Sequence, residues 1–205
     1  MNKQIITKGY KFVNDDLTST HNDFKWMIGQ WRKQEGTLKP CENGLHASRT
    51  PYDVLNYSIA NRLFVIEARG NIVSETDKFV ASEMRLVKEL PTKKIAIEYS
   101  IECARKVLKN YEESYPDDKR VRRAINAAAG VLKNPSDINI KKVFAAVSAA
   151  ESAARSAAES AAWSAAWSAR SAARSAARSA AESAEIEWQK KTLQRIVNKY
   201  EKVRS

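Results

Sequence analysis

Short runs of β-branched and aromatic residues, separated by turn-forming residues, mark the first 92 positions of the chain. Such runs predict strands. They are residues 4–13 (QIITKGYKFV), 44–48 (GLHAS), 62–70 (RLFVIEARG) and 78–90 (KFVASEMRLVKEL). The third run is expected to end at Gly70 and the fourth at Pro91. Thr50, Pro51 and Asp53 have the spacing of an N-cap, a first helical position and a capping box. The pattern predicts a small twisted sheet of four or five strands with one or two short helices.

After Pro91 the apolar positions follow the period of an α-helix. Two such faces are separated by the turn Pro116-Asp117-Asp118. The first comprises Ile97, Ile101, Ala104, Leu108 and Tyr111, and the second comprises Val121, Ala124, Ile125, Ala128 and Leu132. Two helices that pack on each other are therefore expected over residues 97–113 and 118–133.

Alanine and serine dominate the segment that follows, which repeats the unit S-A-A-X over residues 151–185. Alanine is the best helix former, so this segment is expected to be a helix rather than a linker. If residues 137–203 are one unbroken helix, its length is roughly 100 Å. Two shortened units, at 168–170 and 183–185, keep the larger residues on one side and leave an Ala/Ser arc that can pack closely against another helix.

Two tryptophans and a row of arginines stand out on the side of the larger residues. Trp163 and Trp167 lie one helical turn apart, and Arg170, Arg174 and Arg178 follow them. Tryptophan and arginine are the residues that most often anchor protein interfaces. The set is our candidate partner-binding surface, although local core packing of the tryptophans and base stacking on nucleic acid remain alternatives.

The two patterns together predict an α+β protein. Residues 1–92 would form the small mixed sheet domain, and residues 93–205 an elongated alanine-rich domain of antiparallel helices. Near the C-terminus, a heptad-like stripe suggests helix pairing or a homodimer. It consists of Ile186, Leu193, Ile196, Tyr200 and Val203.

Composition narrows the cellular setting more than the activity. The net charge of +11 permits an acidic partner or a nucleic acid without requiring either. Cys41 and Cys103 lie far apart, which argues against a disulfide framework and a cysteine zinc site. There is no apolar N-terminal run of signal-peptide type, and charges interrupt the alanine segment. A cytoplasmic protein, with no membrane contact, is expected.

No standard catalytic, nucleotide-binding or metal-binding motif occurs in the first 92 residues. His46 lies near Cys41 and Glu42, but a fourth metal ligand at sensible spacing is missing. Glu67 lies within an apolar strand and needs either a partner, such as Arg69 or Lys8, or a function. Neither a metal nor a cofactor is expected, and the balance is against an enzyme.

The chain resembles known phage proteins in two pieces. The strand and turn segments from KGYKFV to DKFVASEMRLVKEL resemble an uncharacterised N-terminal domain of phage and prophage proteins. The segment ECARKVLKNYEESYPDDKRVRRAINAA (102–128), with the alanine repeats and EWQKKTLQRIV, resembles phage proteins described as immunity proteins. The resemblance implies a viral or prophage accessory protein.

The order of elements in the first 92 residues is also similar to the core of ADP-ribosyltransferases. By that analogy Lys8 or Tyr10 on the first strand, with His46 or Ser48, would hold a nucleotide. The catalytic glutamate has only Glu83 as a counterpart by position. The residues of a nucleotide pocket would be Lys8, Tyr10, His46, Ser48 and Glu67.

Three functions therefore remain open. The leading hypothesis is a phage-encoded protein that binds and inhibits a host anti-phage defence system, such as a CRISPR-Cas effector or a nucleotide-signalling system. The first alternative is a nucleotide-binding, nucleotide-sequestering or ADP-ribosyltransferase-like N-terminal domain. The second alternative is a nucleic-acid-binding protein that uses the basic helix.

Overall fold

A computed structural model describes residues 5–21, 24–57, 62–134 and 173–202, with the side chains of residues 107 and 173–182 excepted. The strands are β1 (Thr7–Val13), β2 (Arg32–Lys33), β3 (Leu45–Ala47), β4 (Arg62–Ser74) and β5 (Phe79–Leu90), with a 3₁₀ helix η1 (Asp53–Asn56). The helices are α1 (Thr92–Ser114), α2 (Arg120–Lys133) and α4 (Ala173–Lys202). The α+β class is confirmed.

The chain divides into two compact units. Met1–Ile95 and Gln189–Ser205 form the first, and Ala96–Trp188 form the second. The first unit thus combines the sheet with the C-terminal end of α4. The division between residues 92 and 93 that the sequence suggests stays a prediction. The structure additionally assigns the C-terminal end of α4 to the first unit.

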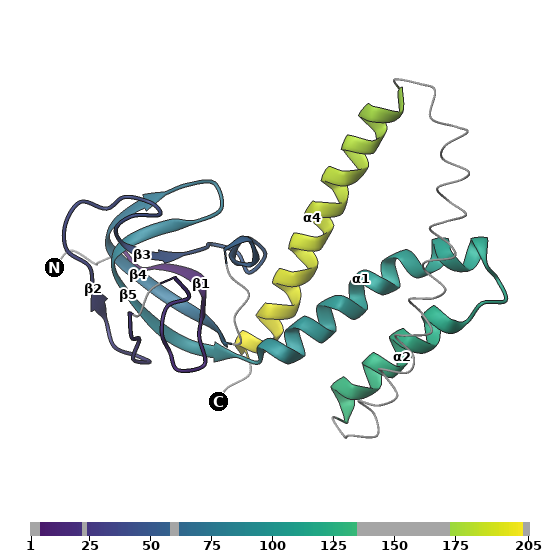
Figure 1. The fold of residues 1–205 in the computed structure, drawn as a ribbon, viewed down its shortest axis with the longest axis horizontal. Coiled ribbons are helices and arrows are strands. Elements are labelled where there is room, and N and C mark those ends of the chain that lie inside the picture. Colours follow the sequence, from purple (N-terminus) through teal and green to yellow (C-terminus); the bar gives the residue numbers. More distant parts are fainter. Residues whose placement is uncertain (1–4, 22–23, 58–61, 135–172, 203–205) are drawn as a thin grey trace. The chain divides into compact units, whose positions relative to one another are not determined.

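All pairings in the sheet are antiparallel, in the order β1-β4-β5-β2, and β3 also pairs with β5. Figure 1 shows β4 and β5 as two long, curved strands. β4 does not end at Gly70 as expected, since it continues to Ser74. Gly70 has a φ of 77° and lies in a register shift between Arg69 and Ile72. It therefore makes a bulge that bends the strand rather than a turn that ends it.

The sheet curls back on itself where the chain leaves β3. The backbone N–H of Tyr10 donates to Ser48 O at 2.8 Å, and Ser48 N–H donates to Tyr10 O at 3.0 Å. A Cβ atom on Gly9 would lie 2.7 Å from Ser48 O, so only glycine permits this close approach. The bridge links β1 to the segment that follows β3.

The core of the first unit lies between the curved sheet and the loop after β1. It contains Phe64, Ile66 and Phe79 from the long strands and Trp26 from the loop. Three residues at the C-terminal end of α4, which belongs to the same unit, are also buried. They are Leu193, Ile196 and Val197, each at most 4% exposed. Two of these residues, Leu193 and Ile196, belong to the predicted heptad-like stripe, so that part of the stripe is buried within the chain itself.

The second unit contains the two amphipathic helices that the sequence predicted. Ile101 and Leu108 of α1 pack with Ile125 of α2 in a small core. At the intervening turn, Asp118 accepts a hydrogen bond from the backbone N–H of Arg120 at 3.0 Å and another from the Tyr111 hydroxyl at 2.8 Å. Hydrogen bonds from Arg120 lower the pKa of Asp118 well below its usual range. The ionised carboxylate therefore accepts from the first backbone N–H of α2, which has no acceptor within the helix.

Most of the predicted alanine-rich domain lies outside the described residues. Trp163, Trp167 and Arg170 are among the residues that the structure does not describe. Arg174 and Arg178 belong to α4, but their side chains are not described. Within the described part of the chain, no helix is both long enough and apolar enough to cross a membrane.

Candidate functional site

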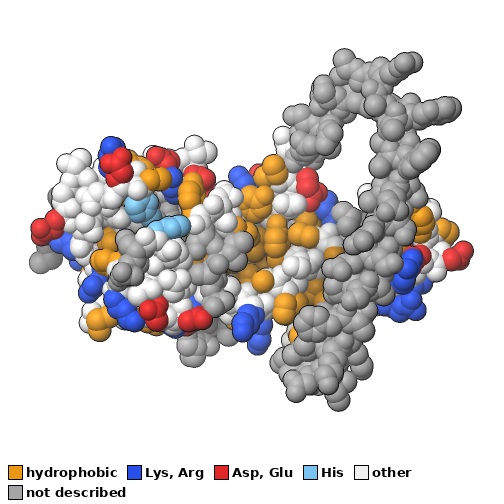
Figure 2. Space-filling view, viewed as in Figure 1, with side chains coloured by type: hydrophobic (Ala, Val, Ile, Leu, Met, Phe, Trp, Pro, Cys, Tyr) orange, Lys and Arg blue, Asp and Glu red, His pale blue; other side chains and the backbone are white. Residues whose placement is uncertain are grey.

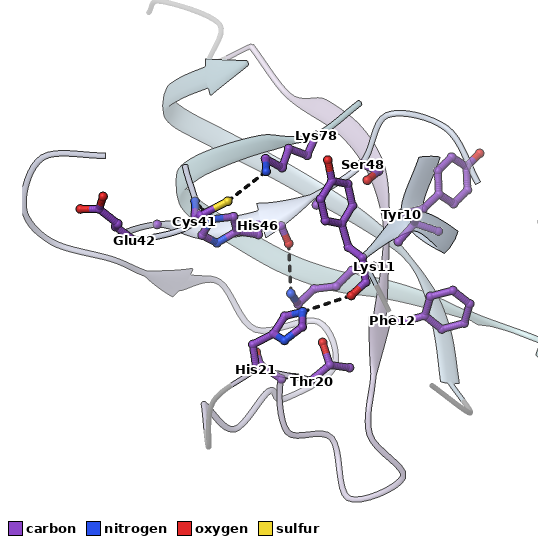
Figure 3. Close-up of a pocket in the computed structure, with 15 residues that line it drawn as sticks. Tyr10, Lys11, Phe12, Thr20, His21, Cys41, Glu42, His46, Ser48 and Lys78 are labelled. Atoms are coloured by element: carbon purple, nitrogen blue, oxygen red, sulfur yellow. Dashed lines mark hydrogen bonds between the residues drawn. The ribbon is translucent and has the colours of Figure 1, made fainter. Parts of the chain in front are cut away.

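A cavity of about 510 Å³ opens in the first unit, beside the bridge between β1 and the end of β3. β1 contributes Tyr10, Lys11 and Phe12, and the other lining residues follow in chain order. They are Ser19, Thr20, His21, Cys41, Glu42, Gly44, His46, Ala47, Ser48, Val54, Tyr57 and Lys78. Figure 3 shows Lys11, His21, His46, Cys41 and Lys78 gathered on one side of β1. Figure 2 shows the two histidines of the chain side by side at the surface.

Lys11 is a partly buried cation on the cavity wall. Its ammonium donates to the backbone oxygen of His46 at 3.0 Å and lies 5.4 Å from the centre of the Trp26 ring. Burial lowers the pKa of Lys11 to about 8. Both partners are neutral, and among the described residues no carboxylate forms an ion pair with Lys11.

His46 is fixed as a neutral acceptor. Its Nε2 accepts a hydrogen bond from the backbone N–H of Cys41 at 2.8 Å, which requires the proton to be on Nδ1. Burial, together with the nearby charge of Lys11, lowers the pKa of His46. The His46 ring therefore fixes the turn that carries Cys41, and the backbone carbonyl of His46 accepts the hydrogen bond from Lys11.

Lys78 lies on the opposite side of His46 from Lys11 in Figure 3. Its ammonium donates to Cys41 Sγ at 3.0 Å, lies 3.2 Å from a carboxylate oxygen of Glu75 and faces the Tyr57 ring at 4.7 Å. The hydrogen bond to Cys41, followed by that to Glu75, raises the pKa of Lys78. Lys78 thus stays charged under all ordinary conditions.

His21 completes the polar side of the cavity. Its Nε2 donates to the backbone oxygen of Tyr57 at 3.1 Å, because a carbonyl can only accept. The loop that carries His21 is held to the core by Trp26, whose ring N–H donates to Ser19 Oγ at 2.9 Å. The position of this wall therefore depends on the core of the unit.

The structure brings together three of the five predicted nucleotide-pocket residues. Tyr10, His46 and Ser48 line the cavity, whereas Lys8 and Glu67 do not. The Tyr10 hydroxyl hydrogen-bonds to residues of α4 instead of a ligand. It donates to Glu201 at 2.6 Å and accepts from Gln194 at 3.0 Å. Burial raises the pKa of Tyr10 to about 12, so the hydroxyl stays protonated.

Glu67 and Glu83 belong to a separate ion-pair cluster on β4 and β5. Glu67 accepts from Arg85 at 2.6 Å, and Glu83 accepts from Arg69 at 2.7 Å. The two guanidinium groups lie 4.7 and 3.9 Å from the Trp31 ring. These carboxylates have structural partners, and neither lines the cavity.

Sequence reasoning missed Lys11, His21, Tyr57 and Lys78, and it considered Cys41 only as a metal ligand. A signal was available for Lys11, because strand alternation places it on the same face as Gly9 and Val13. The other four come from loops whose positions depend on contacts distant in sequence. Among the residues described, no three His, Cys, Asp or Glu side chains gather in a way that could hold a metal ion.

The environments of the two cysteines predict different reactivities. Cys41 is exposed beside the Lys78 ammonium, whereas Cys103 is half-buried and burial raises the pKa of its thiol. Because thiolates react and thiols do not, iodoacetamide should label Cys41 roughly tenfold faster than Cys103. Peptide mass spectrometry over time measures both rates. Equal labelling of the two, or faster labelling of Cys103, would contradict the described environments.

Comparisons with known proteins match the chain in two segments. Residues 7–98 match a family model described as a domain of unknown function, DUF7666. Neither the curated proteins nor the solved structures give a significant match. Residues 86–186 match the model described as "Imm-5 like putative immunity protein", and this match supports the resemblance to immunity proteins.

Proposed function

We propose that this protein is an immunity-type inhibitor that acts by binding a protein effector. The observation that carries the proposal is the match of residues 86–186 to the Imm-5 like model. In its finer form, the proposal is a phage-encoded protein of the host cytoplasm that binds a component of a host anti-phage defence system.

The described helices of the second unit are suited to serve as a rigid support for such a surface. The core of Ile101, Leu108 and Ile125 fixes α1 against α2, and Arg122 forms an ion pair with Glu112 across the two helices. Lys106 of α1 in turn forms an ion pair with Glu185 of α4 at 2.5 Å. Residues 135–172, which lie outside the described residues, follow α2 and precede α4 in the chain.

We place the partner-binding surface on Trp163, Trp167, Arg170, Arg174 and Arg178, as the sequence suggests. The elongated, alanine-rich arrangement of antiparallel helices is part of the same proposal. Large aromatic and arginine side chains on an otherwise small-residue helix would supply the buried anchors of an interface.

Replacing both Trp163 and Trp167 with alanine should lower partner capture at least tenfold, since interface tryptophans each contribute about 2 kcal/mol or more. The measurement is affinity capture from lysate of a bacterial host, quantified by mass spectrometry. Trp31→Ala is the matched control, because Trp31 packs on Arg69 and Arg85 within the sheet unit. Unchanged capture by the double variant, at an unchanged melting temperature, would overturn the assignment of this surface.

A second candidate function is nucleotide binding by the first unit. The observation that favours it is that Tyr10, His46 and Ser48, three of the predicted nucleotide-pocket residues, line one cavity. We favour binding over ADP-ribosyl transfer, because Glu83 forms an ion pair with Arg69 outside the cavity. If the protein transfers radiolabel from NAD to a host protein and Glu83→Gln abolishes that transfer, the first unit is an ADP-ribosyltransferase.

Nucleic-acid binding and self-association are weaker candidates. Exposed Lys191, Arg195, Lys199 and Lys202 extend the basic character of α4 to its C-terminal end. Nucleic-acid binding would require an affinity that falls steeply with salt, because bound phosphates release counterions. A homodimer would have to use surfaces other than Leu193 and Ile196, which are buried in the first unit.

A further inference from the structure

We propose that the cavity of the first unit binds a small organic phosphate of the nucleoside monophosphate class, with Lys11 and Lys78 receiving the phosphate group. This inference deepens the second candidate function, on which it rests, by naming the ligand class and the residues that bind its charge. It is independent of protein capture by the helical unit.

The size of the cavity suits a whole small molecule. Pockets for small organic ligands have volumes of about 300–1,000 Å³, and the cavity encloses about 510 Å³. An inorganic phosphate would leave most of that space empty. The ligand should therefore have an organic part as well as a charged group.

Lys11 supplies the main reason to expect an anion. An enclosed ammonium is costly unless an opposite charge compensates it. The fold provides Lys11 with a carbonyl at 3.0 Å and the face of Trp26, both neutral. Among the described residues, Glu42 is the only carboxylate on the cavity wall, and it pairs with Lys39 at 2.7 Å. A bound phosphate would supply the charge that Lys11 lacks.

Lys78 and His21 add donors around the same space. In Figure 3 Lys11 and Lys78 lie on either side of His46, with His21 below. Lys11 lies on β1 and Lys78 lies in the loop just before β5. The two ammonium groups can therefore contact different oxygens of one phosphate, which accepts hydrogen bonds from several donors. His46 is neutral, and its Nε2 is occupied by Cys41 N–H, so His46 positions Lys11 rather than binding the anion as a cation.

The remaining wall is suited to an apolar or planar group. Ala47 and Val54 are buried on the cavity wall, and Tyr57 is another of the lining residues. An aromatic ring and aliphatic side chains next to paired cations are the surroundings that a base and its phosphate need. A nucleoside monophosphate fits this combination better than a simple carboxylate does.

Binding should depend on pH through Lys11. The groups that face the same space are His46, His21, Lys78, Cys41, Glu42 and Tyr57. Without ligand, burial lowers the pKa of Lys11 to about 8. A phosphate beside the ammonium would raise that pKa, so binding takes up a proton near pH 8 and the affinity falls as the pH rises through that value.

Isothermal titration calorimetry on the full chain tests the inference. The probes are the four ribonucleoside 5′-monophosphates, the four matching nucleosides and inorganic phosphate. At least one monophosphate should bind at least tenfold more tightly than its nucleoside and than inorganic phosphate. Lys11→Met should lower that affinity at least tenfold, whereas Lys8→Met, the same change outside the cavity on the same strand, should leave it unchanged.

The wild-type protein provides a check that does not depend on the folding of a variant. Its affinity for the monophosphate should fall about tenfold or more between pH 7 and pH 9.5. A second variant, Lys78→Met, should also weaken binding.

The outcomes separate two failures. If neither monophosphates nor nucleosides bind at millimolar concentration, both the nucleotide-binding function and this inference are wrong. If nucleosides bind as tightly as monophosphates, or the affinity does not change with pH, the nucleotide pocket stands and the role of Lys11 is wrong. Inorganic phosphate that binds as tightly as any monophosphate would overturn the organic ligand class.

Discussion

Replacing Trp26 with alanine should lower the free energy of unfolding of the first unit by about 3–5 kcal/mol. Trp26 is 1% exposed and belongs to the core of the unit. Its ring contacts Phe24 edge-on at 5.0 Å and donates a hydrogen bond to Ser19. Alanine removes the largest side chain of this core and leaves a cavity that a sheet with paired strands cannot collapse to fill.

The same substitution should also damage the candidate ligand site. Trp26 holds the loop that places Ser19, Thr20 and His21 on the cavity wall, and its ring faces the Lys11 ammonium. Urea unfolding followed by far-UV circular dichroism measures the stability, and monophosphate binding under native conditions measures the site. Both should be impaired in the Trp26→Ala variant.

Trp31→Ala is the control for Trp26→Ala. Trp31 is half-buried and stacks on the guanidinium groups of Arg69 and Arg85 at the surface of the sheet. Such contacts contribute about 0.5–1 kcal/mol each at exposed sites, so Trp31→Ala should cost clearly less than Trp26→Ala. Equal losses in the two variants would show that the loop is not anchored in the core as described.

Local sequence patterns predicted the elements of the fold because they depend on neighbouring residues. The β-branched runs form β1, β3, β4 and β5, and the two helical faces form the core of the second unit. Thr50 and Asp53 do interact as a capping pair, with the Thr50 hydroxyl accepting from Asp53 N–H at 3.1 Å. However, the helix that follows them is only a short 3₁₀ helix, Asp53–Asn56.

Features that depend on distant contacts could not be predicted in the same way. Gly70 looked like the end of a strand, but a glycine with positive φ can equally form a bulge, and only the partner strand decides between them. The pairing of Tyr10 with Ser48 joins residues 38 positions apart and has no sequence signature. The cavity lies at that bridge, so only part of its lining was predictable.

The C-terminal end of α4 illustrates the same limit. The apolar spacing of Leu193 and Ile196 predicted a helix with one buried face but not what covers it. In the structure these residues are buried in the unit that also contains the sheet. Figure 1 shows the yellow end of α4 meeting the sheet.

Replacing Ile196 with alanine should therefore destabilise the sheet unit by about 2–5 kcal/mol, although the residue lies more than 100 positions from the nearest strand. Ile196 is fully buried, and two hydrogen bonds at Glu201, five residues further along α4, fix the helix in one orientation. Tyr10 on β1 donates to Glu201, and Lys88 on β5 donates to the backbone oxygen of the same residue at 2.8 Å. A helix held at two strands cannot shift to fill the space that the isoleucine leaves.

Hydrogen exchange gives the measurement that locates the effect. Amides of β1 and β5 should exchange faster in Ile196→Ala, since they lose the apolar cover that the helix provides. Arg195→Ala, a change at the exposed neighbouring position, should alter the stability by no more than about 0.5 kcal/mol. If both variants lose the same stability, or if faster exchange stays within α4, the helix end does not form part of the sheet unit. Faster exchange of β1 and β5 in Ile196→Ala alone would mean that residues 189–202 cover a sheet whose described strands lie within residues 7–90. The sheet would then reach full stability only after residues 189–202 have been synthesised.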